Sequence, residues 1–156
     1  MTEMTPQGAF AEGDRLFPAM PREHPPSITL LQIRAFNTAQ AHGFDSASFG
    51  ERIALIHSEL SEALEDYRNG RDPADTFYSY DTTGYSGSLS DLESLREDLD
   101  AAGVPAKPCG IPSELADAVI RILDMAEAYG INLEQAILEK MAYNDTRSHR
   151  HGGKIL

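Results

Sequence analysis

Four acidic residues occur as two pairs, each spaced three residues apart within a segment of helical pattern. Glu59 and Glu62 form the first pair, and Glu114 and Asp117 form the second. This spacing places both side chains of a pair on one helix face, one turn apart. If the two faces meet, their carboxylates repel one another unless a hard divalent cation, which prefers oxygen ligands, lies between them. The pattern therefore predicts a Mg²⁺ site formed by these four residues and indicates metal-assisted phosphate chemistry.

The composition narrows the class of protein that contains these residues. The chain has 156 residues and a formal net charge of -12, which predicts one domain and argues against nucleic-acid binding, because contacts to phosphate backbones require clustered Lys and Arg. The single cysteine, Cys109, excludes an internal disulfide and favours the cytoplasm. No apolar run approaches the roughly 20 residues that cross a bilayer, so we expect no membrane association.

The distribution of proline divides the chain into two parts. Residues 1–27 have few positions suited to a core, which predicts an extended or partly disordered N-terminal arm. The prolines of this arm are Pro6, Pro18, Pro21, Pro25 and Pro26. Residues 28–156 have the helical pattern and form the predicted helical domain.

Two helices are predicted before residue 71. The first runs from about Leu30 to His42, and Thr29 and Gln32 have the spacing of a capping box at its start. The second follows Ser48, with Glu51 in the capping position, and ends at Asn69-Gly70. Its expected core stripe consists of Ile53, Ile56, Leu60, Leu64 and Tyr67.

Two further helices follow a long irregular segment. Residues 71–110 lack sustained periodicity and contain at most a short helix that ends near Gly103. The third long helix begins at Pro112, and the fourth begins at Asn132 and fades near Arg147. With no convincing strand, the sequence predicts an all-α four-helix bundle with an insertion between the second and third helices.

Three features together resemble the MazG-like nucleoside triphosphate pyrophosphohydrolases. They are the two acidic pairs, the run Ile111-Pro-Ser-Glu-Leu-Ala-Asp117, and a C-terminal stretch that extends from Glu139-Lys-Met-Ala-Tyr-Asn144 through Arg147 to His151-Gly-Gly-Lys154. The resemblance covers residues 28–154. The chain departs from the family in the longer separation of its acidic pairs, which affects the expected base pocket most.

The resemblance implies a MazG-like bundle that assembles as a homodimer or a dimer of dimers. It implies Mg²⁺-dependent hydrolysis of an NTP or dNTP to the monophosphate and pyrophosphate. Glu59, Glu62, Glu114 and Asp117 would be the metal ligands. Lys140, Asn144 and Arg147 would contact phosphate. Glu59 and Glu62 are the catalytic candidates, and Glu65 also remains open as the general base.

Two other functions fit parts of the same pattern. A non-catalytic helical module would use the acids to bind a structural cation or a basic partner, and it would dimerise without turnover. A carboxylate-bridged redox-metal bundle is the weaker alternative, because His57 does not complete the E-x-x-H spacing of such proteins.

Overall fold

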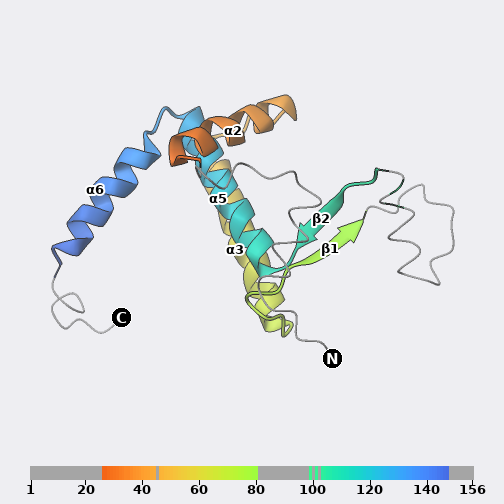
Figure 1. Cartoon of the computed structure of the whole chain (residues 1–156). Helices are drawn as coiled ribbons and strands as arrows, with labels where there is room; N and C mark the ends of the chain where they lie inside the picture. Colours follow the sequence, from red (N-terminus) through yellow and green to blue (C-terminus); the bar gives the residue numbers. More distant parts are fainter. Residues whose placement is uncertain (1–25, 45, 81–98, 100, 102, 148–156) are drawn as a thin grey trace.

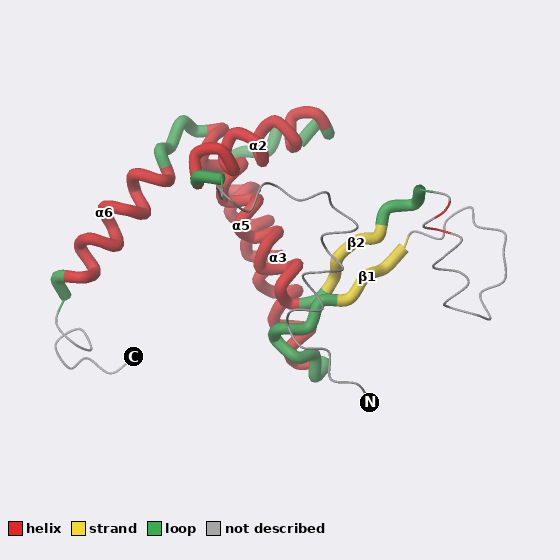
Figure 2. The backbone as a smooth tube through the Cα atoms, viewed as in Figure 1, coloured by secondary structure: helices red, strands yellow, loops and turns green. Residues whose placement is uncertain are grey.

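The computed structural model describes residues 26–44, 46–80, 99, 101 and 103–147. These residues form four helices and a two-stranded antiparallel sheet (Figures 1 and 2). The elements are α2 (Ile28–Ala41), α3 (Phe49–Arg68), β1 (Phe77–Tyr80), β2 (Ala106–Cys109), α5 (Ile111–Ala128) and α6 (Leu133–Asp145). The mainly helical class is confirmed, whereas the expectation that the chain has no strand is wrong.

The centre of the fold is the pair formed by α3 and α5, which lie side by side (Figure 1). Two ion pairs connect the helices: Arg52 binds Asp124, and Glu59 binds Arg121. Residue numbers rise along α3 as they fall along α5, so the helices are antiparallel. At one end of the pair, the Phe49 ring meets the Tyr129 ring edge-on at a centroid distance of 5.1 Å.

The face of α3 that is buried differs from the expected stripe. Its buried residues are Arg52, Ile56, Glu59 and Ala63, which recur at three and four residues as a helix face requires. Of the expected stripe only Ile56 is buried, and Leu60, Leu64 and Tyr67 are exposed. The helical period was predicted correctly, but its phase was wrong, because charged residues satisfied by partners on α5 occupy the contact face.

Helix α2 packs across α5, whereas α6 projects away from the α3–α5 pair (Figure 1). No residue of α6 is buried. Helix α6 touches α2 through Glu134, whose carboxylate accepts hydrogen bonds from the backbone N–H and the Oγ1 hydroxyl of Thr29 at 2.9 and 2.6 Å. In the described residues α5 therefore packs against both α3 and α2, whereas α6 touches the start of α2 and buries no residue.

Side-chain caps define three of the helix starts. Ser48 and Glu51 form the expected capping box, and the Asn132 side chain accepts from the Gln135 N–H as expected. The expected cap at Thr29 is wrong, because Ser27 caps α2 through the Leu30 N–H. Gln32, the expected partner of Thr29, is instead buried and donates to Glu127 and to the Ile131 carbonyl.

The segment between α3 and α5 contains the sheet. Strands β1 and β2 pair in the register Phe77 with Cys109 and Tyr80 with Ala106. The guanidinium of Arg71 lies over the Phe77 ring, 4.3 Å from its centroid. Most of the expected short helix before Gly103 lies outside the described residues, but Leu99 and Ala101, which are described, are helical; the N-terminal arm up to residue 25 also lies outside them. In the described part of the chain, no helix combines the length and apolar character needed to cross a membrane.

Gly110 connects β2 to α5 and is the N-cap of that helix. Its φ is +99°, and an added Cβ would lie 2.6 Å from the carbonyl oxygen of Asp75. Both observations require glycine, because L side chains rarely adopt this conformation and the nearby atom belongs to the backbone. The first turn of α5, which contains Glu114, thus depends on this position.

We predict that Gly110→Ala destabilises the protein by about 1–3 kcal/mol, because it forces a strained φ and a backbone clash. Gly50→Ala is the matched control, since Gly50 lies in α3 with nothing within 4 Å of an added Cβ; it should be neutral or stabilising by up to about 1 kcal/mol. Urea unfolding followed by circular dichroism measures both. Equal stability of the two variants would contradict the role given to Gly110.

Candidate metal centre

The α3–α5 pair brings together three of the four acidic residues singled out in the sequence. Glu59 and Glu62 come from α3, and Glu114 comes from the first turn of α5. One carboxylate oxygen from each lies within 4.8 Å of the others. These three residues are called the acidic cluster below. Their oxygens are close enough to share one cation.

Glu59 is the buried member of the cluster. Its side chain is 8% exposed, and its Oε1 accepts a hydrogen bond of 2.6 Å from Nε of Arg121. A buried carboxylate without a partner is costly, so this ion pair explains how α3 can turn Glu59 toward α5. Glu62 is exposed, and its Oε1 is 3.4 Å from Oγ of Ser58.

The surroundings of Glu114 raise its pKa above the ordinary value for glutamate. Burial is the largest cause, followed by repulsion from Glu62, Asp117 and Glu59, while Lys107 acts in the opposite direction. Both main causes disfavour the ionised carboxyl. The cluster therefore has an excess of negative charge that a bound cation would relieve.

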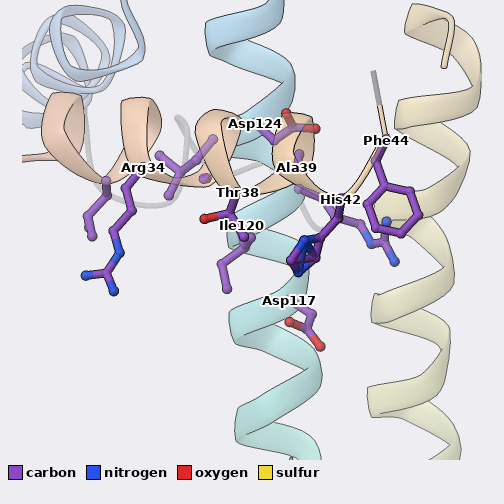
Figure 3. Close-up of a pocket in the computed structure, with 12 residues that line it drawn as sticks. Arg34, Thr38, Ala39, His42, Phe44, Asp117, Ile120 and Asp124 are labelled. Atoms are coloured by element: carbon purple, nitrogen blue, oxygen red, sulfur yellow. The ribbon is translucent and has the colours of Figure 1, made fainter. Parts of the chain in front are cut away.

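Asp117 lies one helical turn beyond Glu114 and repels it, but it is not among the oxygens that converge within 4.8 Å. It lines a cavity between α2 and α5 instead. Figure 3 shows Arg34, Thr38 and His42 on the α2 side of this cavity, with Asp117 and Ile120 on α5. Asp117 therefore lies where the acidic cluster and the cavity meet.

The cavity has a volume of about 550 Å³, within the range of small-molecule sites. It is lined by Leu31, Arg34, Ala35, Thr38, Ala39, His42, Phe44, Asp117, Ile120, Arg121, Leu123 and Asp124. The mixture of apolar walls with a few polar groups is typical of sites that orient an organic ligand. Because Arg121 lines the cavity and also contacts Glu59 of the acidic cluster, a ligand here could extend from an apolar wall toward the acids.

The expected phosphate contacts are not near the acidic cluster in a single chain. Lys140 and Asn144 lie on α6, and Arg147 follows that helix; α6 points away from α3 and α5 (Figure 1). The Lys140 ammonium lies over the Tyr143 ring, 5.3 Å from its centroid. Residues 148–156, which include the rest of the C-terminal motif, lie outside the described residues.

Sequence reasoning overlooked Arg121 and the ion pair between Arg52 and Asp124. Arg52 is buried, and it also donates to the carbonyl of Ala47. Asp124 has a buried Oδ1 for which the described residues provide no hydrogen-bond partner. The sequence contained a signal for both ion pairs: charged residues stand at helical spacing within largely apolar segments. Such residues need opposite charges on a neighbouring helix when they are buried.

The donor set suits Mg²⁺ on chemical grounds. This cation takes oxygen ligands and is commonly bound by one or two carboxylates together with waters and substrate phosphates. The acidic cluster offers carboxylate oxygens only, and burial together with the neighbouring acids raises the pKa of Glu114, which a bound cation would counteract. The described residues thus fit the metal that the sequence predicts.

We predict that Glu114→Gln raises the melting temperature of the metal-free protein by a few degrees at pH 7, because it removes a charge that the cluster disfavours. The same change should abolish stabilisation by added Mg²⁺. Thermal unfolding with Mg²⁺ and with EDTA measures both effects. Glu65→Gln is the control: it removes the same charge from an exposed position of α3 and should leave the response to Mg²⁺ unchanged.

The pH dependence of this effect has a definite sign. Since the pKa of Glu114 is raised by folding, the penalty for its charge grows as pH rises from the ordinary glutamate pKa to the raised one, and it is fully present above that value. The advantage of Glu114→Gln should therefore vanish at pH values below the ordinary pKa. An advantage that persists unchanged there would contradict the electrostatic explanation.

Comparison with known proteins gives no further support for a family. No family model matches the chain, and no curated protein or solved structure is significantly similar to it. The resemblance to the MazG-like family therefore depends on the acidic pairs and the C-terminal motif, and the function must be argued from the site itself.

Proposed function

We propose that this protein is a Mg²⁺-dependent nucleoside triphosphate pyrophosphohydrolase that releases a nucleoside monophosphate and pyrophosphate. The observation that supports the proposal most strongly is the convergence of Glu59, Glu62 and Glu114, which Arg121 connects to a cavity that it lines together with Asp117. The acids would hold the metal beside the phosphates, and the cavity would take the nucleoside.

The proposed reaction is attack of a water oxygen on the α-phosphorus. The bond between this phosphorus and the oxygen that bridges to the β-phosphate breaks, and pyrophosphate leaves. Bound Mg²⁺ would lower the pKa of the attacking water and neutralise the charge of phosphate oxygens. Glu59, Glu62, Glu114 and Asp117 would provide the ligands of the Mg²⁺ ion, and one of the carboxylates would accept the proton of the attacking water.

Glu62 is the best candidate for the proton acceptor. Glu59 is buried and engaged by Arg121, and burial and repulsion already disfavour the charge of Glu114. Glu62 is exposed and therefore accessible to water. Glu65, the other base candidate, is not among the converging oxygens.

A second copy of the chain would complete this site. Helix α6 has 13 residues, none of them buried, and an isolated helix of this length is marginal in water. Its apolar residues Leu138 and Met141 are exposed, as are Leu60 and Leu64 on α3. In a homodimer, α6 of one copy would cover apolar surface of the other and bring Lys140 and Asn144 toward the partner's acids, which restores the MazG-like four-helix arrangement.

We expect Glu62→Gln to lower the rate of pyrophosphate release at least about 100-fold, because it removes the proton acceptor and a metal ligand. A panel of NTPs and dNTPs, assayed with Mg²⁺ for pyrophosphate and monophosphate, provides the measurement. Glu65→Gln should retain activity, and both variants should keep the wild-type helical content. If folded wild-type protein is stabilised by Mg²⁺ but turns over no nucleotide, the non-catalytic metal-binding module becomes the better explanation.

The proposed dimer predicts complementation between two inactive variants. Glu62→Gln and Lys140→Gln, co-expressed with different tags and purified through both, should form a heterodimer with one complete site and about half of the wild-type activity. Each variant alone should be strongly impaired. If the heterodimer is inactive although both parents fold, or if the tagged chains do not associate, the partner does not supply Lys140.

A further inference from the structure

Arg121 lies where three features of the molecule meet. It follows Asp117 by one turn on α5, its Nε donates to Oε1 of Glu59 at 2.6 Å, and it lines the cavity between α2 and α5. Its side chain is 42% exposed although its partner is buried. The ion pair uses Nε, one of five N–H donors of a guanidinium. Further donors on the Nη atoms can serve a ligand while the ion pair is kept.

The charge balance of the site also singles out Arg121. Lys140 and Arg147 lie on or after α6, which points away from the acids. Lys107 lowers the pKa of Glu114 through its charge, but it is not among the residues that line the cavity. Arg121 contacts Glu59 of the acidic cluster and also lines the cavity, so it can act on both.

We propose that Arg121 binds a substrate phosphate while it holds Glu59 in position. This inference rests on the proposed pyrophosphohydrolase function and adds a residue to it. Through Nε the guanidinium fixes the carboxylate, and through Nη it donates to an oxygen of the triphosphate. The planar fork of arginine suits two acceptors at once, whereas the ammonium of lysine acts as a point charge.

The role of Arg121 has a consequence for metal binding. The side chain lies against Glu59 with a positive charge, which opposes a cation in the acidic cluster and attracts phosphate. Loss of this charge should therefore not weaken Mg²⁺ binding in the absence of phosphate, but it should weaken the binding of phosphate once Mg²⁺ is bound. A residue that acted only by holding Glu59 would affect Mg²⁺ binding first.

Arg121→Gln tests the inference by isothermal titration with two probes, Mg²⁺ alone and pyrophosphate at saturating Mg²⁺. We expect Mg²⁺ affinity equal to or above that of the wild type. Pyrophosphate affinity should fall about 10- to 100-fold, the loss typical of a hydrogen bond to a charged group. Arg68→Gln is the control, because it removes the same charge from an exposed residue at the end of α3, and it should bind both probes as the wild type does.

Arg121→Lys is the second variant and preserves the charge if the glutamine variant fails to fold. It should bind Mg²⁺ normally and pyrophosphate about 3- to 10-fold more weakly, since one ammonium replaces a fork. Wild-type pyrophosphate affinity in either folded variant would overturn the inference, as would a loss that merely follows a loss of Mg²⁺ binding. A wild-type protein that binds no pyrophosphate would contradict the proposed function as well, so the two failures can be distinguished.

Discussion

The contact between α3 and α5 depends on charged side chains that each need a partner on the other helix. Arg52 and Glu59 lie on the buried face of α3, and Asp124 and Arg121 of α5 neutralise them. The Arg52–Asp124 pair is the more buried of the two, and removing one partner of a buried ion pair typically costs about 3–5 kcal/mol, because the remaining charge is poorly solvated. The two pairs thereby fix the antiparallel register of the helices, and this register determines where Glu62 meets Glu114.

The same register creates an electrostatic conflict at the end of the helix pair. Burial and like charges raise the pKa of Glu114, and only one acid of the cluster, Glu59, has a cationic partner in direct contact among the described residues. Such an arrangement lowers stability unless a cation or a ligand completes it. Clustered like charges of this kind are typical of binding sites, where a ligand rather than the fold compensates the repulsion. Gly110 contributes to the position of Glu114, because it lets the chain pass from β2 directly into α5 close to the backbone of Asp75.

The apolar surface of the chain indicates a second level of organisation. Leu60, Leu64 and Tyr67 of α3 remain exposed, and α6 has no buried residue. Among the described residues, α5 covers one face of α3, and another face of α3 stays exposed. Clustered exposed apolar residues usually mark an interface. The exposed face of α3 and the exposed apolar residues of α6 are the surfaces on which the proposed dimer rests.

Residues close together in the chain were enough to predict the local features of this protein. The caps at Ser48 and Asn132, the helical segments, and the acidic pairs all follow from residues close together in the chain, because caps and helix faces depend on spacings of three and four. Three features became visible only when the elements were packed: the buried face of α3, the pairing of residues 77–80 with residues 106–109, and the contact between Arg121 and Glu59. These outcomes depend on partners distant in sequence, and a single helix pattern cannot reveal the charge that a neighbouring helix will supply.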